Sequence, residues 1–349
     1  KCNYLKLIIV CDYSYMKTIT KGKNMNNLKK IGLTALAGSL TAISAHAAEL
    51  GVSGASVLTF TDRNADEVTG NPWGMKTNLS FTGSGEVNGY TVSYMQTSKD
   101  QFAGMSSARL SVDMGDMGTI AFDQGSGSGL ATIDDKTPSA AEEVWDGLDA
   151  SAATSNVPSR GLVGAAGSSG VFNFVNSYSG VNVNAAYRKG AGASSADGGT
   201  SGEGSNGGAW DFALTSSEIT GVEGLSVGAG YGEASAALDG KTNEHTTIFA
   251  NYSVGMFTVG IQQSDIDNGK LEDTDEDTFA YGIAVNINDN LSISYGGRDT
   301  DYQKNAAADV TEEITGFAAA YTMGSIKVAG NINEVTNNLG TANLKDENM

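Results

Sequence analysis

The amino-acid sequence predicts an all-β chain folded as a transmembrane, up-and-down antiparallel β-barrel. Three observations predict this fold class. Apolar and polar residues alternate with period two in nearly every segment after residue 48, most of these segments have 8 to 13 residues, and short and long connections alternate between them. Period two places successive side chains on opposite faces of a strand. A tilted transmembrane strand needs about 9–11 residues, whereas a typical soluble strand has about 5–6.

The alternation predicts fifteen strands. They are 51–63, 73–84, 89–98, 106–114, 118–124, 171–178, 181–189, 208–218, 224–234, 245–254, 256–264, 277–288, 291–299, 312–323 and 325–334. Bacterial barrels of this type close with an even number of strands. We therefore expect a 16-stranded barrel of which about 15 strands are present, with the C-terminal strand truncated after Val335. An open barrel would leave unpaired backbone groups in lipid.

The connections are sorted by length. Every second one is a tight turn, such as Ser179-Gly180, Gly255 and Gly324, and the others are long. A barrel that crosses a bilayer has tight turns at one end and long loops at the other. The alternative fold, a soluble β-sandwich or solenoid, gives no reason for this sorting.

The polar face of the strands carries charge. Lys76, Arg109, Arg188, Asp211 and Lys327 all occur opposite the apolar positions of their strands. So many charges would carry a large desolvation penalty inside a packed core. They are tolerated in a water-filled lumen, with the apolar face turned to lipid.

Residues 25–47 have the three parts of a secretory signal peptide. A charged start with Lys29 and Lys30 is followed by an apolar stretch at 31–43 and by Ala45-His46-Ala47. The 13 apolar residues are too few for a membrane-spanning helix, which needs about 20. We therefore expect cleavage before Ala48, an upstream extension at 1–24, and one barrel domain at 48–349.

The exported part is strongly acidic. Residues 48–349 contain 14 basic and 39 acidic residues, a formal charge of −25. Nucleic-acid binding needs a basic footprint, so we expect no nucleic-acid partner. Both cysteines, Cys2 and Cys11, precede residue 48, which leaves no disulfide framework.

The sequence predicts no enzyme and no cofactor. His245 is the single histidine after residue 47, and no cysteine accompanies it. A nucleophile–base pair therefore has little support. Asp273, Asp275 and Asp277 alternate like the start of a calcium loop but lack the glycine and final glutamate of an EF-hand. A loose surface site for Ca²⁺ or Mg²⁺ stays open as an alternative.

Several segments resemble one family. They are the leader MNNLKKIGLTALAGSLTAISAHA, the strand AELGVSGASVLTF, the hairpin WGMKTNLSFTGSGEVNGYTVSY and the segment MGDMGTIAFDQGSGSG. Together they resemble the Gram-negative general diffusion porins of alphaproteobacterial type, over residues 25 to about 337. Members usually end in an aromatic residue, whereas this chain ends in Met349.

The resemblance implies a 16-stranded homotrimer in the bacterial outer membrane, in contact with lipid and lipopolysaccharide. It implies a water-filled channel for passive diffusion of small hydrophilic solutes and ions. The alternatives are a structural or adhesive outer-membrane barrel with a blocked lumen, and a barrel enzyme such as a lipase.

The longest connection, about residues 125–170, is the candidate constriction loop, because a loop of this length is usually functional or disordered. Pro138, Ser139 and Glu142 predict a helix start with a capping box, continuing to about Leu148. By resemblance this loop folds inward and narrows the pore. Its acidic side would consist of Glu142, Glu143, Asp146 and Asp149.

By the same resemblance, the opposite wall carries positive charge. The candidates with lumen parity are Lys76, Arg109, Arg188 and Lys327. Opposed charges select ions and orient dipolar solutes, and the acidic excess predicts a weak cation preference. The alternative is that the acids form a solvated loop face and the basic residues merely keep the lumen polar.

Overall fold

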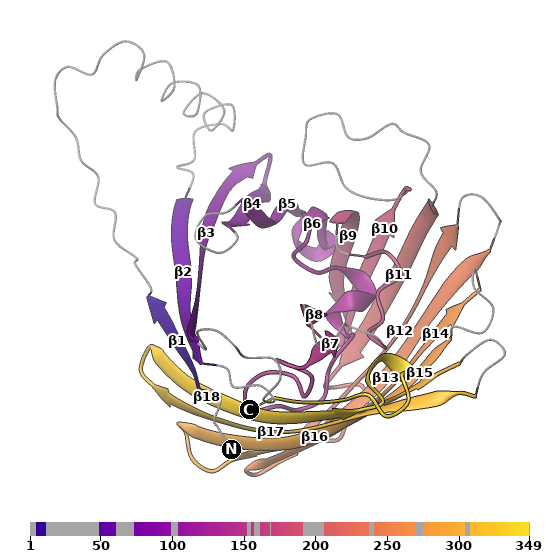
Figure 1. The fold of residues 1–349 in the computed structure, drawn as a ribbon. Helices are drawn as coiled ribbons and strands as arrows, with labels where there is room; N and C mark the ends of the chain where they lie inside the picture. Colours follow the sequence, from indigo (N-terminus) through magenta and orange to yellow (C-terminus); the bar gives the residue numbers. More distant parts are fainter. Residues whose placement is uncertain are drawn as a thin grey trace.

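The computed structural model describes residues 5–11, 49–60, 73–98, 104–151, 155–156, 161–167, 169–190, 206–236, 241–269, 275–303 and 308–348. Sixteen strands pair antiparallel around a ring (Figure 1). They are β1 (Leu5–Cys11), β2 (Glu49–Phe60), β3 (Trp73–Val87), β4 (Tyr90–Ser98), β5 (Met105–Asp113), β6 (Thr119–Gln124), β9 (Ser169–Tyr178), β10 (Val181–Arg188), β11 (Asn206–Ser216), β12 (Leu225–Ala236), β13 (Thr242–Val254), β14 (Phe257–Asn268), β15 (Glu276–Asn286), β16 (Leu291–Tyr302), β17 (Val310–Met323) and β18 (Ile326–Thr336).

The fifteen predicted strands are all present as β2–β6 and β9–β18, and the expected number of sixteen is confirmed. Their ends differ from the prediction by a few residues. The strands could be predicted from the sequence because each strand has one apolar and one polar face along its length. Further elements are short: β7 (Asp149–Ser151), β8 (Ser155–Asn156), β19 (Lys345–Asn348), and the 3₁₀ turns η2 (Gly115–Met117), η3 (Gly129–Thr132) and η4 (Asn338–Gly340).

The sixteenth strand differs from the expectation. β1 pairs with β2 along its length and with Ile326–Ala329 of β18, while β19 pairs with Asn333–Thr336 on the same edge of β18. β1 lies within residues 1–24, which the sequence analysis treats as an upstream extension and does not count among the predicted strands. The physical reason is that pairing satisfies the backbone groups of two edges that would otherwise stay open. The predicted leader, 25–47, lies outside the described residues.

Tight turns at one end of the barrel follow from local sequence. In the turn between β3 and β4, Asn88 and Gly89 have φ of 52° and 84°, and Ser179 and Gly180 between β9 and β10 have φ of 51° and 80°. Two consecutive left-handed residues form the hairpin turn whose twist matches that of the strands.

In the described part of the chain, no helix has the length and apolar character needed to cross a bilayer.

The two faces of the sheet are chemically distinct. On β14, Val259 and Ile261 point outward and are about half exposed, whereas Gly260 and Gln262 point inward and are buried. The same outward apolar exposure recurs on other strands, as at Leu110, Phe172, Ile248, Tyr295, Phe317 and Ile332. A continuous exposed apolar face of this kind is the surface that a barrel turns to lipid.

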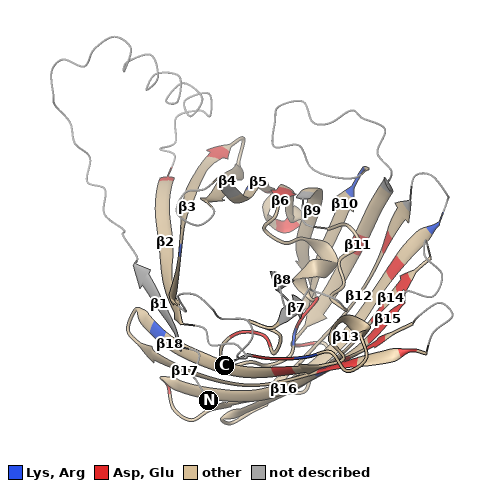
Figure 2. Ribbon diagram, viewed as in Figure 1, with Lys and Arg blue, Asp and Glu red and all other residues tan. Residues whose placement is uncertain are grey.

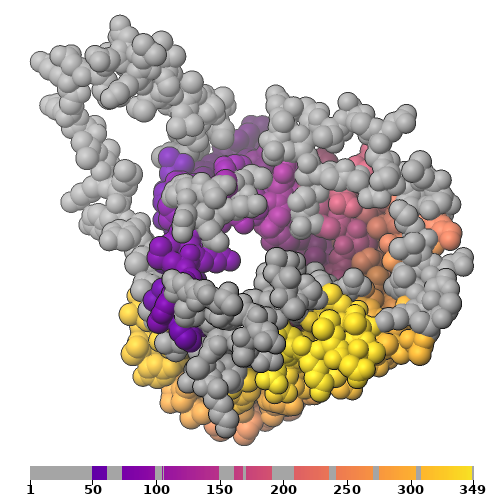
Figure 3. Space-filling view, viewed as in Figure 1, coloured from indigo at the N-terminus to yellow at the C-terminus, as the bar shows by residue number. Residues whose placement is uncertain are grey.

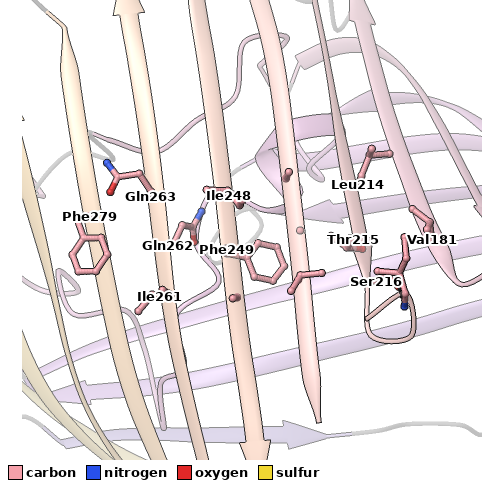
Figure 4. A pocket seen from close by; sticks show the side chains of 15 residues that line it. Val181, Leu214, Thr215, Ser216, Ile248, Phe249, Ile261, Gln262, Gln263 and Phe279 are labelled. Carbon is pink, nitrogen blue, oxygen red and sulfur yellow. Dashed lines mark hydrogen bonds between the residues drawn. The ribbon is translucent and has the colours of Figure 1, made fainter. Parts of the chain in front are cut away.

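This outward face has a groove of about 440 Å³ across β11–β15 (Figure 4). Leu214, Ile248, Ile261 and Phe279 line it, and β12 contributes the small residues Gly228 and Ala229. The groove exists because β12 has little side-chain volume there. Its lining is almost wholly apolar, so it belongs to the lipid-facing surface and not to a site for hydrophilic solutes.

Candidate pore constriction

The connection between β6 and β9 lies inside the ring, against its polar face (Figure 1). We call residues 129–148 its outgoing arm and residues 161–167 its returning arm. Both arms are hydrogen-bonded to wall side chains.

The entry of this loop is shaped by two charged residues. Asp123, at the end of β6, is fully buried and accepts hydrogen bonds from the backbone N–H of Ser126 (3.1 Å) and the hydroxyl of Ser128 (2.7 Å). Arg109 Nη1 donates to the carbonyl of Gly127 at 3.4 Å. The carboxylate and the guanidinium therefore turn the chain inward as it leaves β6.

The outgoing arm crosses the wall from β10 to β18. Its backbone meets one wall side chain after another: Gly129 N–Asn184 Oδ1 at 2.9 Å, Leu130 N–Asp211 Oδ1 at 3.0 Å, Lys136 N–Gln262 Oε1 at 2.7 Å, Ala140 N–Ser294 Oγ at 2.8 Å and Asp146 O–Asn333 Nδ2 at 2.8 Å. Because the wall satisfies these backbone groups, the arm needs no regular secondary structure.

The returning arm uses three ionisable wall residues as acceptors. Ala166 N donates to Asp211 Oδ2 at 2.7 Å, Gly164 N to His245 Nδ1 at 3.3 Å, and Gly161 N to Glu276 Oε2 at 2.7 Å. Asp211 therefore binds both arms, with one carboxylate oxygen for each. His245 serves as a hydrogen-bond acceptor for the loop.

Close approach to the wall depends on lumen-facing glycines. A Cβ atom placed on Gly260 would lie 2.5 Å from Pro138 Cδ, and one on Gly282 would lie 2.7 Å from the Pro138 carbonyl oxygen. Only glycine leaves room for the loop backbone at these two positions. The loop thus lies flat on this part of the wall.

The helix expected after Pro138 does not form, which corrects the prediction. The backbone instead makes two consecutive turns, closed by Asp146 N–Glu143 O and Leu148 N–Trp145 O. Ser139 Oγ accepts from Ala141 N and donates to the carbonyl of Glu142, so no capping box is made. The physical reason is that the wall binds this segment every few residues, which fixes an irregular path.

The predicted acids lie on the loop tip. Glu143 is exposed, and Glu142 and Asp146 are half-buried. Asp149 begins β7, and its side chain lies outside the described residues. Two acids that the sequence analysis missed, Asp134 and Asp135, lie on the outgoing arm.

The pKa values of some of these loop acids differ from the ordinary values of carboxyl groups. Burial raises the pKa of Asp134 to about 6, and it also raises the pKa of Asp135. The predicted helix at 138–148 marks the acids of the tip in the sequence, whereas no local sequence pattern marks Asp134 and Asp135.

We expect the charge of the loop to fall between pH 7 and pH 5. With a pKa of about 6, Asp134 is about 90% ionised at pH 7 and about 10% at pH 5. The cation preference should decrease over this range, and the decrease should be smaller in Asp134→Asn, measured as reversal potentials in a KCl gradient. Identical pH profiles for parent and variant would contradict this assignment.

Through Asp134, stability depends on pH in the opposite direction to that caused by a carboxylate whose pKa is lowered on folding. The folded pKa of Asp134 lies above its ordinary value of 3.8. Its contribution to loop seating is therefore fully present below about pH 4 and is lost as the pH rises through about 6.

The four predicted basic residues lie on four different strands. Lys76 is exposed on β3, Arg109 is bound to the loop entry, Arg188 on β10 lies beside the returning arm, and Lys327 is half-buried on β18. Figure 2 shows the basic positions spread around the ring. The structure does not gather these cations at one place opposite the loop.

In the described part of the chain, the loop therefore covers the lumen face of β10–β18, and its outgoing and returning arms do not contact that of β2–β4. On β2–β5 the inner face forms a hollow of about 390 Å³ lined by Thr82, Ser84, Ser93 and Ser111, with Glu49 and Arg109 at its sides. In Figure 3 an opening passes through the middle of the molecule, beside the indigo-to-purple strands. A solute that enters meets hydroxyl groups on one side and the acidic loop on the other.

The candidate cation ligands are engaged by the protein. Asp275 Oδ1 accepts from the backbone N–H of Asn268 at 2.8 Å, and Asp277 Oδ1 accepts from the amide of Gln263. Asp273 lies outside the described residues. Among the residues that the structure describes, no group of three or more acidic, histidine or cysteine side chains is arranged to hold a metal ion.

A ring of strands long enough to cross a bilayer, an outward apolar face and a polar lumen that holds a folded loop define a pore-forming barrel of the outer membrane. The model of the family described as Gram-negative porin matches residues 32–341, and the chain belongs to this family. The family resemblance is thereby confirmed. Porins form channels through the outer membrane.

Several solved structures share the fold. OmpT, an outer membrane protein of Vibrio cholerae, is 13% identical with a TM-score of 0.59, over 87% of this chain and 96% of that one. An anion-selective porin from Comamonas acidovorans is 12% identical with a TM-score of 0.58, over 86% and 97%. A mutant of Rh. blastica porin is 17% identical with a TM-score of 0.54, over 86% and 98%. No curated protein matches the chain.

Proposed function

We propose that this porin lets small hydrophilic solutes and ions diffuse passively through a water-filled channel, with a weak preference for cations. The observation that carries the proposal is the seated loop. It lies flat on one half of the lumen wall and leaves a hydroxyl-lined passage beside it. An inner wall of hydroxyl, amide and charged groups suits hydrated solutes.

The loop charge supports the cation preference. Asp134, Asp135, Glu142, Glu143 and Asp146 place five carboxylates on one side of the passage, whereas Lys76 is exposed on the other. Carboxylate-lined constrictions favour cations. A structure of the same fold is named an anion-selective porin, so the fold alone does not imply a cation preference and the proposal depends on the side chains.

The test replaces three acids of the loop tip by their uncharged amides. In Glu142→Gln/Glu143→Gln/Asp146→Asn, the reversal potential in a KCl gradient should move toward zero. The matched control Glu218→Gln/Glu223→Gln/Asp289→Asn removes the same charge at exposed positions in the short turns. An equal shift in both variants would mean that net charge, and not the loop, sets the preference.

We further propose that the chain works as a homotrimer surrounded by outer-membrane lipid and lipopolysaccharide, after export through the predicted leader and without a cofactor. One OmpT structure of the same fold is described as a trimer form. Crosslinking of the membrane-inserted protein should give a species of three subunits, and a monomer alone would refute the trimer.

The alternative, a structural or adhesive barrel with a blocked lumen, predicts a different result. Liposomes that contain the blocked protein would not swell in sugar solutions. The hydroxyl-lined passage predicts swelling whose rate falls with increasing sugar size.

A further inference from the structure

One buried arginine lies beneath the tip of the acidic loop. Arg298 of β16 faces the lumen and is only 1% exposed. Its guanidinium carbon lies 4.2 Å from the centre of the Trp145 ring, and its Nη2 lies 3.5 Å from Glu312 Oε1 on β17. The sequence analysis did not include Arg298 in the basic wall.

The partner of this arginine is itself held in place. Glu312 is fully buried, and its Oε2 accepts a hydrogen bond from the backbone N–H of Leu339 at 2.6 Å. Tyr302 Oη donates to Glu312 Oε1 at 3.5 Å. The carboxylate therefore has a fixed position, and it neutralises the charge of Arg298 locally.

The rest of the tip packs around the same point. Leu148 is fully buried and packs with Ile314 and Val335, while Val144 and Trp145 cover this cluster. The amide groups of Asn331 and Asn333 donate to the carbonyl of Asp146, at 3.2 and 2.8 Å. These contacts hold the backbone of the tip, whereas Arg298 stacks on the ring that stands between the acids.

The planar guanidinium group explains why position 298 carries an arginine and not a lysine. Arginine stacks on an aromatic face and keeps its charge when buried, whereas lysine is a point charge on a flexible stem. A cation over a tryptophan ring is a favourable contact that becomes stronger when water is excluded. The Arg298–Trp145 stack is excluded from water, since Arg298 is buried.

We propose that Arg298 is a positioning residue that, through Trp145, fixes the tip carrying Glu142, Glu143 and Asp146, and so sets the width and cation preference of the passage. The proposal rests on the proposed channel function. Because its charge is paired with Glu312, Arg298 acts through position and not as an opposing charge in the lumen.

The experiment uses the full chain with Trp73→Phe and Trp210→Phe, which leaves Trp145 as the sole tryptophan. The main variant, Arg298→Met/Glu312→Gln, removes the stack without leaving one buried charge unpaired. Arg298→Lys keeps the charge pair but loses the planar stack. Lys189→Met, which removes an exposed cation just after β10, is the control.

We expect acrylamide quenching of Trp145 to rise about twofold in the double variant and less in Arg298→Lys, and single-channel conductance to rise with it. Lys189→Met should change neither the quenching nor the conductance step. Intact barrels are selected in each case by their heat-modifiable mobility on gels. If the double variant does not fold, Arg298→Lys decides by the same two readouts.

Unchanged quenching and conductance in an intact variant would overturn the proposal. Equal changes in the Lys189→Met control would also overturn it, because removal of any cation would then have the same effect. If quenching rises but the parent protein gives no channels at all, the proposed function fails while the positioning of the tip by Arg298 stands.

Discussion

Replacement of Asp211 by alanine is expected to release both arms of the loop and to enlarge the channel. Asp211 is 2% exposed, and its two carboxylate oxygens accept the N–H groups of Leu130 and Ala166. Hydrogen bonds to a charged group contribute about 1.5–3 kcal/mol each, and a buried donor left without a partner adds a further cost. The loop should therefore spend much of its time away from the wall near these two residues.

Single-channel recording measures this release. We expect Asp211→Ala to show a larger and noisier conductance than the parent, with the barrel itself still inserted. The matched variant Asp211→Asn keeps one acceptor oxygen and should lie between the two. A conductance identical to the parent in both variants would show that Asp211 does not hold the loop.

A charge placed on the outward face is expected to prevent stable insertion. Phe81 of β3 is 43% exposed on the apolar face, and its neighbour Ser80 lies on the polar face beside Thr97. Arginine at the lipid-facing midplane of a barrel destabilises it by about 2–4 kcal/mol. Phe81→Arg should therefore fold poorly into bilayers, whereas Ser80→Arg should be tolerated because its charge enters the lumen.

The measurement is the folded fraction after refolding into lipid vesicles across a denaturant series. The two variants differ by one position in the same strand, so their difference reports the face and not the depth. Equal destabilisation by both variants would contradict the assignment of lipid and water to the two faces.

The strands could be predicted because each of them repeats the same local contrast. Lipid on one side and a polar lumen on the other require apolar and polar residues to alternate with period two. This alternation is clear in the sequence from Phe279 to Ile287. The contribution of Leu5–Cys11 could not be predicted, since its place depends on two distant edges, those of β2 and β18.

The loop was harder to predict than the barrel. Its length marked it, and the acids of its tip were identified, but its path is set by wall side chains far away in sequence, such as Asp211 and Gln262. Parity could place Asp211 on the lumen side, yet nothing local shows that it bonds to two loop amides. Arg298 was likewise visible only as a polar residue in a strand, because its partners Trp145 and Glu312 come from separate segments.

The central claim is that a barrel with a seated loop leaves a water-filled passage. Single-channel recording of the full chain in planar bilayers tests it most directly. The account predicts discrete conductance steps of one size in the parent and larger steps in Asp211→Ala. Membranes that contain the folded, inserted protein and show no steps in either form would contradict the account.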